Sequence, residues 1–274
     1  RETIVAWDKS TGIPFGRAIV WQDRRTAERC TELLPMLSTV RTITGLVLDP
    51  YFSGSKVQWM IKNGQAPRSA DLAVGTIDSW IIWNLTGAKS FVTDPSNASR
   101  TMLFDINNMH WSEQMCDTFD VPLASLPTVV PSSGRCGVTQ SYASTNNKAA
   151  INIPGSIPIS GIAGDQQAAL FGQACFETGS SKNTYGTGSF VLMNVGTACP
   201  PPTEGMLTTV AWDLGTGETT YALEGAIFVT GSAIQWLRDG INIIDHASQI
   251  GPLAESVPNT GGVVVVPAFT GLGS

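Results

Sequence analysis

Hydrophobic and polar positions form short alternating runs over the first twenty residues of the chain. Residues 4–7 and 18–21 are two mainly apolar runs, and the polar stretch between them contains Gly12. Apolar runs bounded by polar and glycine residues are typical of strands joined by a turn. The pattern predicts an N-terminal β-hairpin.

Helical spacing of apolar positions begins after this hairpin. Residues 24–36 carry Ala27, Cys30 and Leu33 at a helical interval, which predicts a helix. Asp49 followed by proline is a helix start, because the carboxylate can cap the first turn and the proline ring needs no amide partner. Similar start and stop signals predict helices over residues 49–64, 78–85, 112–119, 166–174 and 232–239.

Strands dominate the second half of the sequence. Residues 122–154 are rich in Pro, Ser, Thr and Asn and read as a long irregular connection. Beyond them, β-like runs predict strands over residues 157–161, 183–185, 190–195, 207–212, 220–224 and 263–267. A strand, a glycine and then a helix is how α/β folds present catalytic groups at a sheet edge. We expect an α/β protein with two domains, residues 1–174 and 175–274.

Composition and charge exclude several classes of protein. Of 274 residues, 42% are hydrophobic and only 14% are charged, which predicts a globular chain rather than a disordered one. The net charge of −6, without a basic cluster, argues against nucleic acid as a ligand. The sequence has no apolar run long enough to span a membrane and no signal-peptide pattern.

The five cysteines are odd in number and widely spaced. They form no CxxC pair, and the chain has only two histidines, so we expect no zinc site. Scattered thiols of this kind are typical of buried side chains in a reducing compartment. We therefore expect a cytoplasmic protein.

Asp165 is the first candidate for chemistry. It follows Gly164 at the switch from strand to helix, where a carboxylate can face a cleft and act as a base. Aspartate at this position is also a common helix cap, and the local sequence favours the cap over the base.

Two glycine-containing segments are candidates for phosphate binding. Gly186 and Thr187 lie between two predicted strands, where they could approach a phosphate, although a plain hairpin turn is the simpler interpretation. Gly231 and Gln235 lie at a predicted helix start, which can receive a phosphate but in most proteins receives nothing.

The remaining candidates are weaker when each is taken alone. Arg1 and Glu2 together offer donors and acceptors that suit a polyol, but residues at a chain end are usually solvated. Trp21, Tyr51 and Phe190 are aromatic residues, and aromatic residues mostly fill cores.

Taken together, these segments resemble the FGGY carbohydrate kinase family, and within it the members that phosphorylate glycerol. The matching blocks occur in the family's order along nearly the whole chain, at residues 1–3, 18–26, 49–54, 97–103, 161–173, 182–188 and 266–273. The resemblance implies an actin-like (ribonuclease H-like) two-domain sugar kinase fold. It also implies transfer of the γ-phosphoryl group of ATP, with Mg²⁺, to a terminal hydroxyl of glycerol, giving sn-glycerol 3-phosphate.

The resemblance also implies a role for each candidate residue. Asp165 would be the general base. The residues that hold the hydroxyls of glycerol or pack against its carbons would be Arg1, Glu2, Tyr51, Gln166, Trp21 and Phe190. The residues on the nucleotide side would be Gly186, Thr187, Gly231 and Gln235. No residue is expected to form a metal site of its own.

The sequence departs from the family pattern at both ends. The family's N-terminal phosphate loop and its later nucleotide-binding glycines have no counterpart, so we expect a fragment that is inactive as a kinase by itself. An Arg- and Gly-rich loop that binds fructose 1,6-bisphosphate in some members has only residues 147–152 near its place, so the sequence leaves that control open. The alternatives are another polyol or pentulose kinase of this family, or a polyol-binding fragment without catalysis. A homo-oligomer is left open for the full-length protein.

Overall fold

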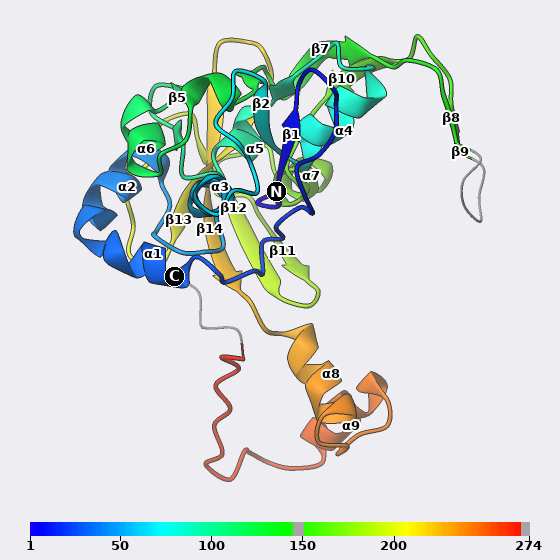
Figure 1. Ribbon diagram of the computed structural model, residues 1–274. Helices are drawn as coiled ribbons and strands as arrows, with labels where there is room; N and C mark the ends of the chain where they lie inside the picture. The colour runs from blue at the N-terminus through cyan, green and yellow to red at the C-terminus, as the bar shows by residue number, and fades with distance from the viewer. Residues whose placement is uncertain (145–150, 270–274) are drawn as a thin grey trace.

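The chain folds into a body of short helices and strands from which two segments project (Figure 1). The computed structural model describes residues 1–144 and 151–269, so residues 147–150 and 270–273 of the blocks named above lie outside the described residues. The strands β8 and β9 extend from the body as a hairpin, and α8 and α9 form a C-terminal segment below it (Figure 1).

The secondary structure alternates between short helices and short strands. The α-helices are α1 (Ala27–Glu32), α2 (Leu37–Thr44), α3 (Ser53–Lys62), α4 (Ile77–Leu85), α5 (Pro95–Ala98), α6 (Glu113–Thr118), α7 (Asp165–Gly172), α8 (Gly231–Asp239) and α9 (Ile250–Glu255). The 3-10 helices are η1 (Leu34–Met36), η2 (Leu123–Ser125) and η3 (Ala247–Gln249). The strands of the first half are β1 (Ile4–Asp8), β2 (Leu72–Thr76), β3 (Val92–Thr93), β4 (Phe104–Asp105), β5 (His110–Trp111), β6 (Thr128–Val129), β7 (Ser133–Val138) and β8 (Tyr142–Ser144). Those of the second half are β9 (Ile151–Ile153), β10 (Pro158–Gly161), β11 (Ser181–Tyr185), β12 (Ser189–Gly196), β13 (Leu207–Asp213) and β14 (Thr219–Ile227).

The second half of the chain forms an antiparallel four-stranded sheet in the order β11-β12-β14-β13. Strands β13 and β14 of this sheet pack against the first half of the chain. Gly45 follows α2 with a φ of +72°, and a Cβ there would meet the carbonyl oxygen of Thr208 on β13 at 2.4 Å. The amide of Thr208 donates to the Gly45 carbonyl at 2.9 Å, and the Tyr221 hydroxyl on β14 donates to the Ile106 carbonyl at 2.7 Å. This close contact sets β14 beside the N-terminal residues.

Most of the predicted helices and strands are confirmed. Ser112 caps α6, since its hydroxyl oxygen accepts from the amide of Met115 at 3.2 Å. Helices α4, α7 and α8 and strands β10 to β14 lie where capping and β-like runs predicted them. Helix α3 begins at Ser53 rather than at Asp49, whose carboxylate accepts from the amide of Tyr51 in the preceding turn.

The predicted N-terminal hairpin is confirmed only in its turn and direction, because residues 18–21 form no strand. The chain turns after Asp8 and returns antiparallel to β1 through two isolated bridges, Trp7 with Pro14 and Ile4 with Ile19, while the strand that pairs with β1 is β2. Pro14 has no amide proton for a ladder, and the carbonyls of Val20 and Trp21 accept from a lysine instead of from a strand.

The predicted single helix over residues 24–36 is interrupted. Helix α1 ends at Glu32, and Pro35 lies in the first turn of the 3-10 helix that follows. Proline disfavours helical geometry in the residue before it, so the apolar spacing did not reveal the break.

The predicted strand over residues 263–267 is also wrong. These residues belong to no strand in the described part of the chain, and their four valines are 63–82% exposed. β-Propensity alone does not form a strand where no neighbouring strand pairs with it.

The buried carboxyl of Asp78 at the start of α4 provides a test of this packing. It accepts from the hydroxyls of Thr76 at 2.6 Å and Thr93 at 2.7 Å, and burial raises its pKa to about 6 despite these bonds. The pKa of this carboxyl is 3.8 in the unfolded chain and about 6 in the folded one, so between these pH values the folded state binds more protons than the unfolded state. The free energy of unfolding therefore falls as the pH rises from 3.8 to about 6. We expect the unfolding free energy of Asp78→Asn, relative to the unaltered chain, to rise by up to about 3 kcal/mol from pH 4 to pH 7. Urea unfolding at several pH values measures it, and a difference independent of pH contradicts the buried carboxyl.

Candidate active site

Asp165 lies at the first position of α7 and does not cap its own helix. Gly164 is the N-cap residue and α7 has no side-chain cap, so the cap favoured by the local sequence is wrong. The Asp165 side chain is 68% exposed, and its Oδ1 lies 3.2 Å from Nε of Arg1. A Cβ on Gly164 would come within 2.8 Å of the Arg1 side chain, so only glycine permits this approach. The carboxylate is therefore fixed at the surface beside a buried cation.

Arg1 is buried, although a residue at a chain end is usually solvated. Only 2% of its side chain is exposed. Its Nη1 donates to Glu224 Oε2 at 2.7 Å, and its Nη2 donates to Glu224 Oε1 at 3.3 Å and to the Tyr51 hydroxyl at 3.4 Å. Its Nε lies 3.4 Å from Glu2 Oε1. The guanidinium thus joins Asp165 to a group of buried charges.

Arg100 completes this group, which we call the buried charge cluster: Arg1, Glu2, Arg100 and Glu224. The Arg100 guanidinium donates to Glu2 Oε1 and to Glu224 Oε1, each at 2.8 Å. Burial opposes ionisation of Glu2, but the charges of Arg1 and Arg100 outweigh it and lower its pKa to about 2. The same two guanidinium groups lower the pKa of Glu224 against the effect of burial. Two cations and two anions balance, so the cluster stays charged at neutral pH.

Aromatic rings form one wall beside this cluster. The rings of Trp21 and Tyr51 meet edge to face at 5.5 Å, and the ring of Phe228 stacks on Tyr51 at 5.5 Å. Phe190 instead packs against the apolar cluster that contains Leu170. Thus the structure brings Trp21 and Tyr51 together as expected and adds Phe228, which the sequence did not indicate.

A polar chain holds the other oxygen of Asp165. The amide nitrogen of Gln166 donates to Asp165 Oδ2 at 3.1 Å, and the Lys182 ammonium donates to Gln166 Oε1. Lys182 also donates to the Thr184 hydroxyl at 2.9 Å and is buried. Burial, with the nearby charge of Arg1, lowers the pKa of Lys182 to about 8. Lys182 therefore orients the Gln166 amide so that its nitrogen faces Asp165.

The four residues assigned to the nucleotide side lie close to one another. The Gly231 amide donates to the Gly186 carbonyl at 3.0 Å, and the next amide, of Ser232, donates to the Thr187 carbonyl at 3.1 Å. A Cβ on Gly231 would lie 2.3 Å from the Gly186 carbonyl oxygen. The β11–β12 turn therefore occupies these first amides of α8, while Gly186, Thr187 and Gln235 stay exposed.

Four residues of the candidate site were not identified from the sequence: Arg100, Lys182, Glu224 and Phe228. Glu224 ends a run that otherwise reads as an apolar strand, and a glutamate at a strand end is usually solvated. Arg100 and Lys182 lie in blocks that carry the family resemblance, but nothing local indicates that they are buried. Their partners come from distant parts of the chain.

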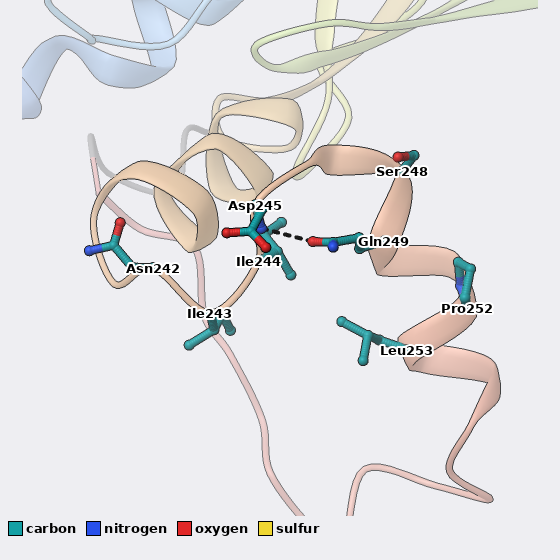
Figure 2. A pocket seen from close by; sticks show the side chains of 8 residues that line it. All are labelled: Asn242, Ile243, Ile244, Asp245, Ser248, Gln249, Pro252 and Leu253. Carbon is teal, nitrogen blue, oxygen red and sulfur yellow. Dashed lines mark hydrogen bonds between the residues drawn. The ribbon is translucent and has the colours of Figure 1, made fainter.

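A separate cavity of about 510 Å³ lies in the C-terminal segment (Figure 2). It is lined by Asn242, Ile243, Ile244, Asp245, Ser248, Gln249, Pro252 and Leu253. The Asp245 amide donates to Gln249 Oε1 at 2.7 Å across one side of it (Figure 2). None of these lining residues was predicted to act in catalysis or binding, so the candidate site stays at Asp165.

The described residues show neither a cluster of metal ligands nor a membrane-spanning helix. Residues 1–144 and 151–269 contain no group of three or more His, Cys, Asp or Glu side chains that could hold a metal ion. In the same part of the chain, every helix is too short or too polar to cross a membrane.

Comparison with known proteins places both halves of the chain in one family. Residues 1–172 match the N-terminal domain of the FGGY family of carbohydrate kinases, and residues 181–274 match its C-terminal domain. The whole chain is 50% identical to "Glycerol kinase 2" of Thermotoga maritima, covering 54% of that protein, and 51% identical to "Glycerol kinase" of Bacillus cereus, covering 55% of it. The chain thus spans about half the length of these curated relatives.

Solved structures show the same fold. The structure of Plasmodium falciparum glycerol kinase with ADP superposes with a TM-score of 0.86 at 38% identity, covering all of this chain and 54% of that one. Xylulose kinase from Rhodospirillum rubrum superposes with a TM-score of 0.78 at 21% identity, covering 98% of this chain and 54% of that one, and shows the fold alone. The expected two-domain sugar kinase fold is confirmed, while the boundary at residue 174 stays a prediction. The chain belongs to the FGGY family of carbohydrate kinases.

Proposed function

We propose that this chain forms the glycerol-binding side, and part of the nucleotide side, of an ATP-dependent glycerol kinase that produces sn-glycerol 3-phosphate. The observation that carries the proposal is the exposed Asp165 carboxylate, held 3.2 Å from Arg1 beside the buried charge cluster. The names of its relatives at 50–51% identity support glycerol as the substrate. The five free cysteines fit a cytoplasmic location.

Asp165 is the proposed base. Arg1 fixes its Oδ1 and Gln166 fixes its Oδ2, so the carboxylate is oriented while most of its surface stays open. A terminal hydroxyl of glycerol placed on the open side would transfer its proton to this carboxylate as its oxygen forms the new bond to the γ-phosphorus of ATP. The bond from that phosphorus to the β,γ-bridging oxygen breaks in the same step, and ADP leaves. Phosphoryl transfer depends mainly on such positioning and on charge stabilisation.

The other residues would select the polyol. Arg1, Glu2, Tyr51 and Gln166 combine donors and acceptors for the hydroxyls, and Trp21 offers an apolar surface to the carbons. Phe190 is assigned the same apolar role by the family resemblance. A substrate that breaks a hydrogen bond of this paired cluster must replace it, so the cluster favours molecules whose hydroxyls match it.

ATP with Mg²⁺ would supply the phosphoryl group and neutralise its charge. Gly186, Thr187, Gly231 and Gln235 are the residues proposed to approach it, and the exposed Thr187 hydroxyl is a suitable donor. Mg²⁺ would be bound mainly through the phosphates of ATP, as is usual for this ion.

The binding half of the proposal can be tested on the chain itself. Glycerol should raise the unfolding temperature in a concentration-dependent way, because a ligand at 100 times its Kd stabilises the folded state by about 2.7 kcal/mol. Differential scanning fluorimetry measures the shift, with xylulose as the competing sugar and Asp71→Asn as a control at an exposed aspartate. Asp165→Asn should keep most of the protection by glycerol, because the amide can still hydrogen-bond to a hydroxyl. Protection by xylulose but not glycerol would favour a pentulose kinase, and protection by neither would reject a preformed polyol site.

A further inference from the structure

Lys56 is fully buried on α3 and points at backbone oxygens rather than at a carboxylate. Its ammonium donates to the carbonyls of Val20 at 2.9 Å, Trp21 at 3.2 Å and Tyr51 at 3.1 Å. An ammonium has three N–H groups, so each of them has its own carbonyl acceptor.

These three carbonyls belong to the two segments that supply Trp21 and Tyr51, two of the three rings of the aromatic wall. Trp21 and Tyr51 lie in irregular segments before α1 and before α3, and their rings meet edge to face. The Tyr51 hydroxyl lies 3.4 Å from Nη2 of Arg1. The Lys56 ammonium therefore links the backbone under both rings to one point on a regular helix.

Burial of the Lys56 ammonium costs free energy of folding, which indicates a role for this residue other than stability. A buried charge loses its hydration, and an apolar side chain of similar size usually packs as well or better. In the described residues Lys56 forms no ion pair with a carboxylate, so its direct partners are the three carbonyl oxygens.

We propose that Lys56 is a positioning residue that holds Trp21 and Tyr51 in the geometry of the polyol site. The role in polyol binding rests on the function proposed above, whereas the positioning of the two aromatic residues does not. Loss of the positive charge at Lys56 is then expected to loosen the aromatic wall without unfolding the chain.

The protonation of Lys56 gives this proposal a signature. Burial lowers the pKa of Lys56 to about 8, although the facing groups Glu2, Asp23, Asp49 and Cys30 favour the charged form. A neutral amine has only two N–H groups, so above this pH one of the three carbonyls loses its donor. In the unfolded chain the pKa of this lysine is 10.5, so between about pH 8 and pH 10.5 the unfolded chain binds more protons than the folded one. The free energy of unfolding therefore rises with pH in this range, and deprotonation of Lys56 does not destabilise the fold. A change at Trp21 in this range is therefore local.

Fluorine NMR of the 274-residue chain labelled with 5-fluorotryptophan tests the proposal. The Trp21 resonance is assigned from its absence in Trp21→Phe. In the unaltered chain it should be single and should shift with a midpoint near pH 8. In Lys56→Met it should be shifted or broadened at pH 7 and lack that midpoint, while the resonance of Trp212, in another cluster, stays unchanged. Lys62→Met, the same substitution at an exposed site on α3, should match the unaltered chain.

Three results would overturn the proposal. The first is a Trp21 resonance in Lys56→Met that equals that of the unaltered chain. The second, which applies even if Lys56→Met does not fold, is the absence of any Trp21 shift between pH 7 and pH 9. The third is loss of the shift in Lys182→Met, because Lys182 has a pKa in the same range. Persistence of the shift in Lys182→Met supports Lys56 as its source.

Calorimetry with glycerol separates the two proposals. Lys56→Met should bind glycerol about tenfold more weakly than Lys62→Met, as expected for a misplaced binding wall. If the unaltered chain binds no glycerol, the proposed function fails, and the NMR result still decides the role of Lys56. Equal affinity of the two variants would overturn the role of Lys56 in binding.

Discussion

Glu224→Ala is expected to destabilise the chain by about 3–5 kcal/mol, because it leaves two buried guanidinium groups without their shared partner. Glu224 accepts from Arg1 at 2.7 Å and from Arg100 at 2.8 Å, and it is fully buried. Arg100 would retain only Glu2, and its Nη1 already has no partner within the described residues. The loss is comparable with the whole stability of many domains.

Urea unfolding measures this effect. Glu218→Ala removes an exposed glutamate from the turn before β14 and should change stability little. Glu224→Gln keeps the shape of the side chain and one acceptor oxygen. Its decrease in the free energy of unfolding should therefore lie between the decreases of the two alanine variants. If Glu224→Ala and Glu218→Ala were equally stable, the buried charge cluster would not hold the two halves of the chain together.

Asp165→Asn is expected to lower the rate of phosphoryl transfer by about 10²–10⁴-fold, the usual range for loss of a general base. The assay needs a completed chain, which we define as this sequence joined to the remainder of the Bacillus cereus relative, since the two overlap over 55% of the latter. The 274-residue chain alone is expected to show no useful turnover. The Asp165 side chain is 68% exposed, so the amide should leave the fold intact.

A coupled assay for glycerol 3-phosphate gives kcat and KM separately. Most of the loss should fall on kcat, because the amide can still hydrogen-bond to a hydroxyl but cannot take its proton. Asp71→Asn in the completed chain is the matched control and should behave as the unaltered protein. A kcat for Asp165→Asn within a few fold of that control would remove Asp165 from its role as the base.

The sequence predicted those parts of the structure that depend on local signals. Helix α6 follows from the cap at Ser112, and β13 and β14 follow from apolar runs bounded by glycines. The break at Pro35 and the failed strand over residues 263–267 show the limits of such signals. A spacing rule does not register the conformation that a proline imposes, and β-propensity does not supply a partner strand.

The candidate site could be predicted only where the family resemblance named its residues. Arg1 and Glu224 are separated by 223 positions, and Arg100 and Glu224 by 124, so only the tertiary fold brings them together. Local sequence even favoured the wrong role for Asp165, since a cap and a base share the same position before a helix. Phe228 lies just after β14, and its sequence position does not indicate that its ring stacks on that of Tyr51.

A crystal structure of the chain with bound glycerol tests the central claim most directly. The account predicts a glycerol hydroxyl within about 3 Å of the Asp165 carboxylate, with the other hydroxyls on Arg1 and its neighbours in the buried charge cluster. Glycerol bound elsewhere, or an Asp165 carboxylate turned back onto the first amides of α7, would contradict it.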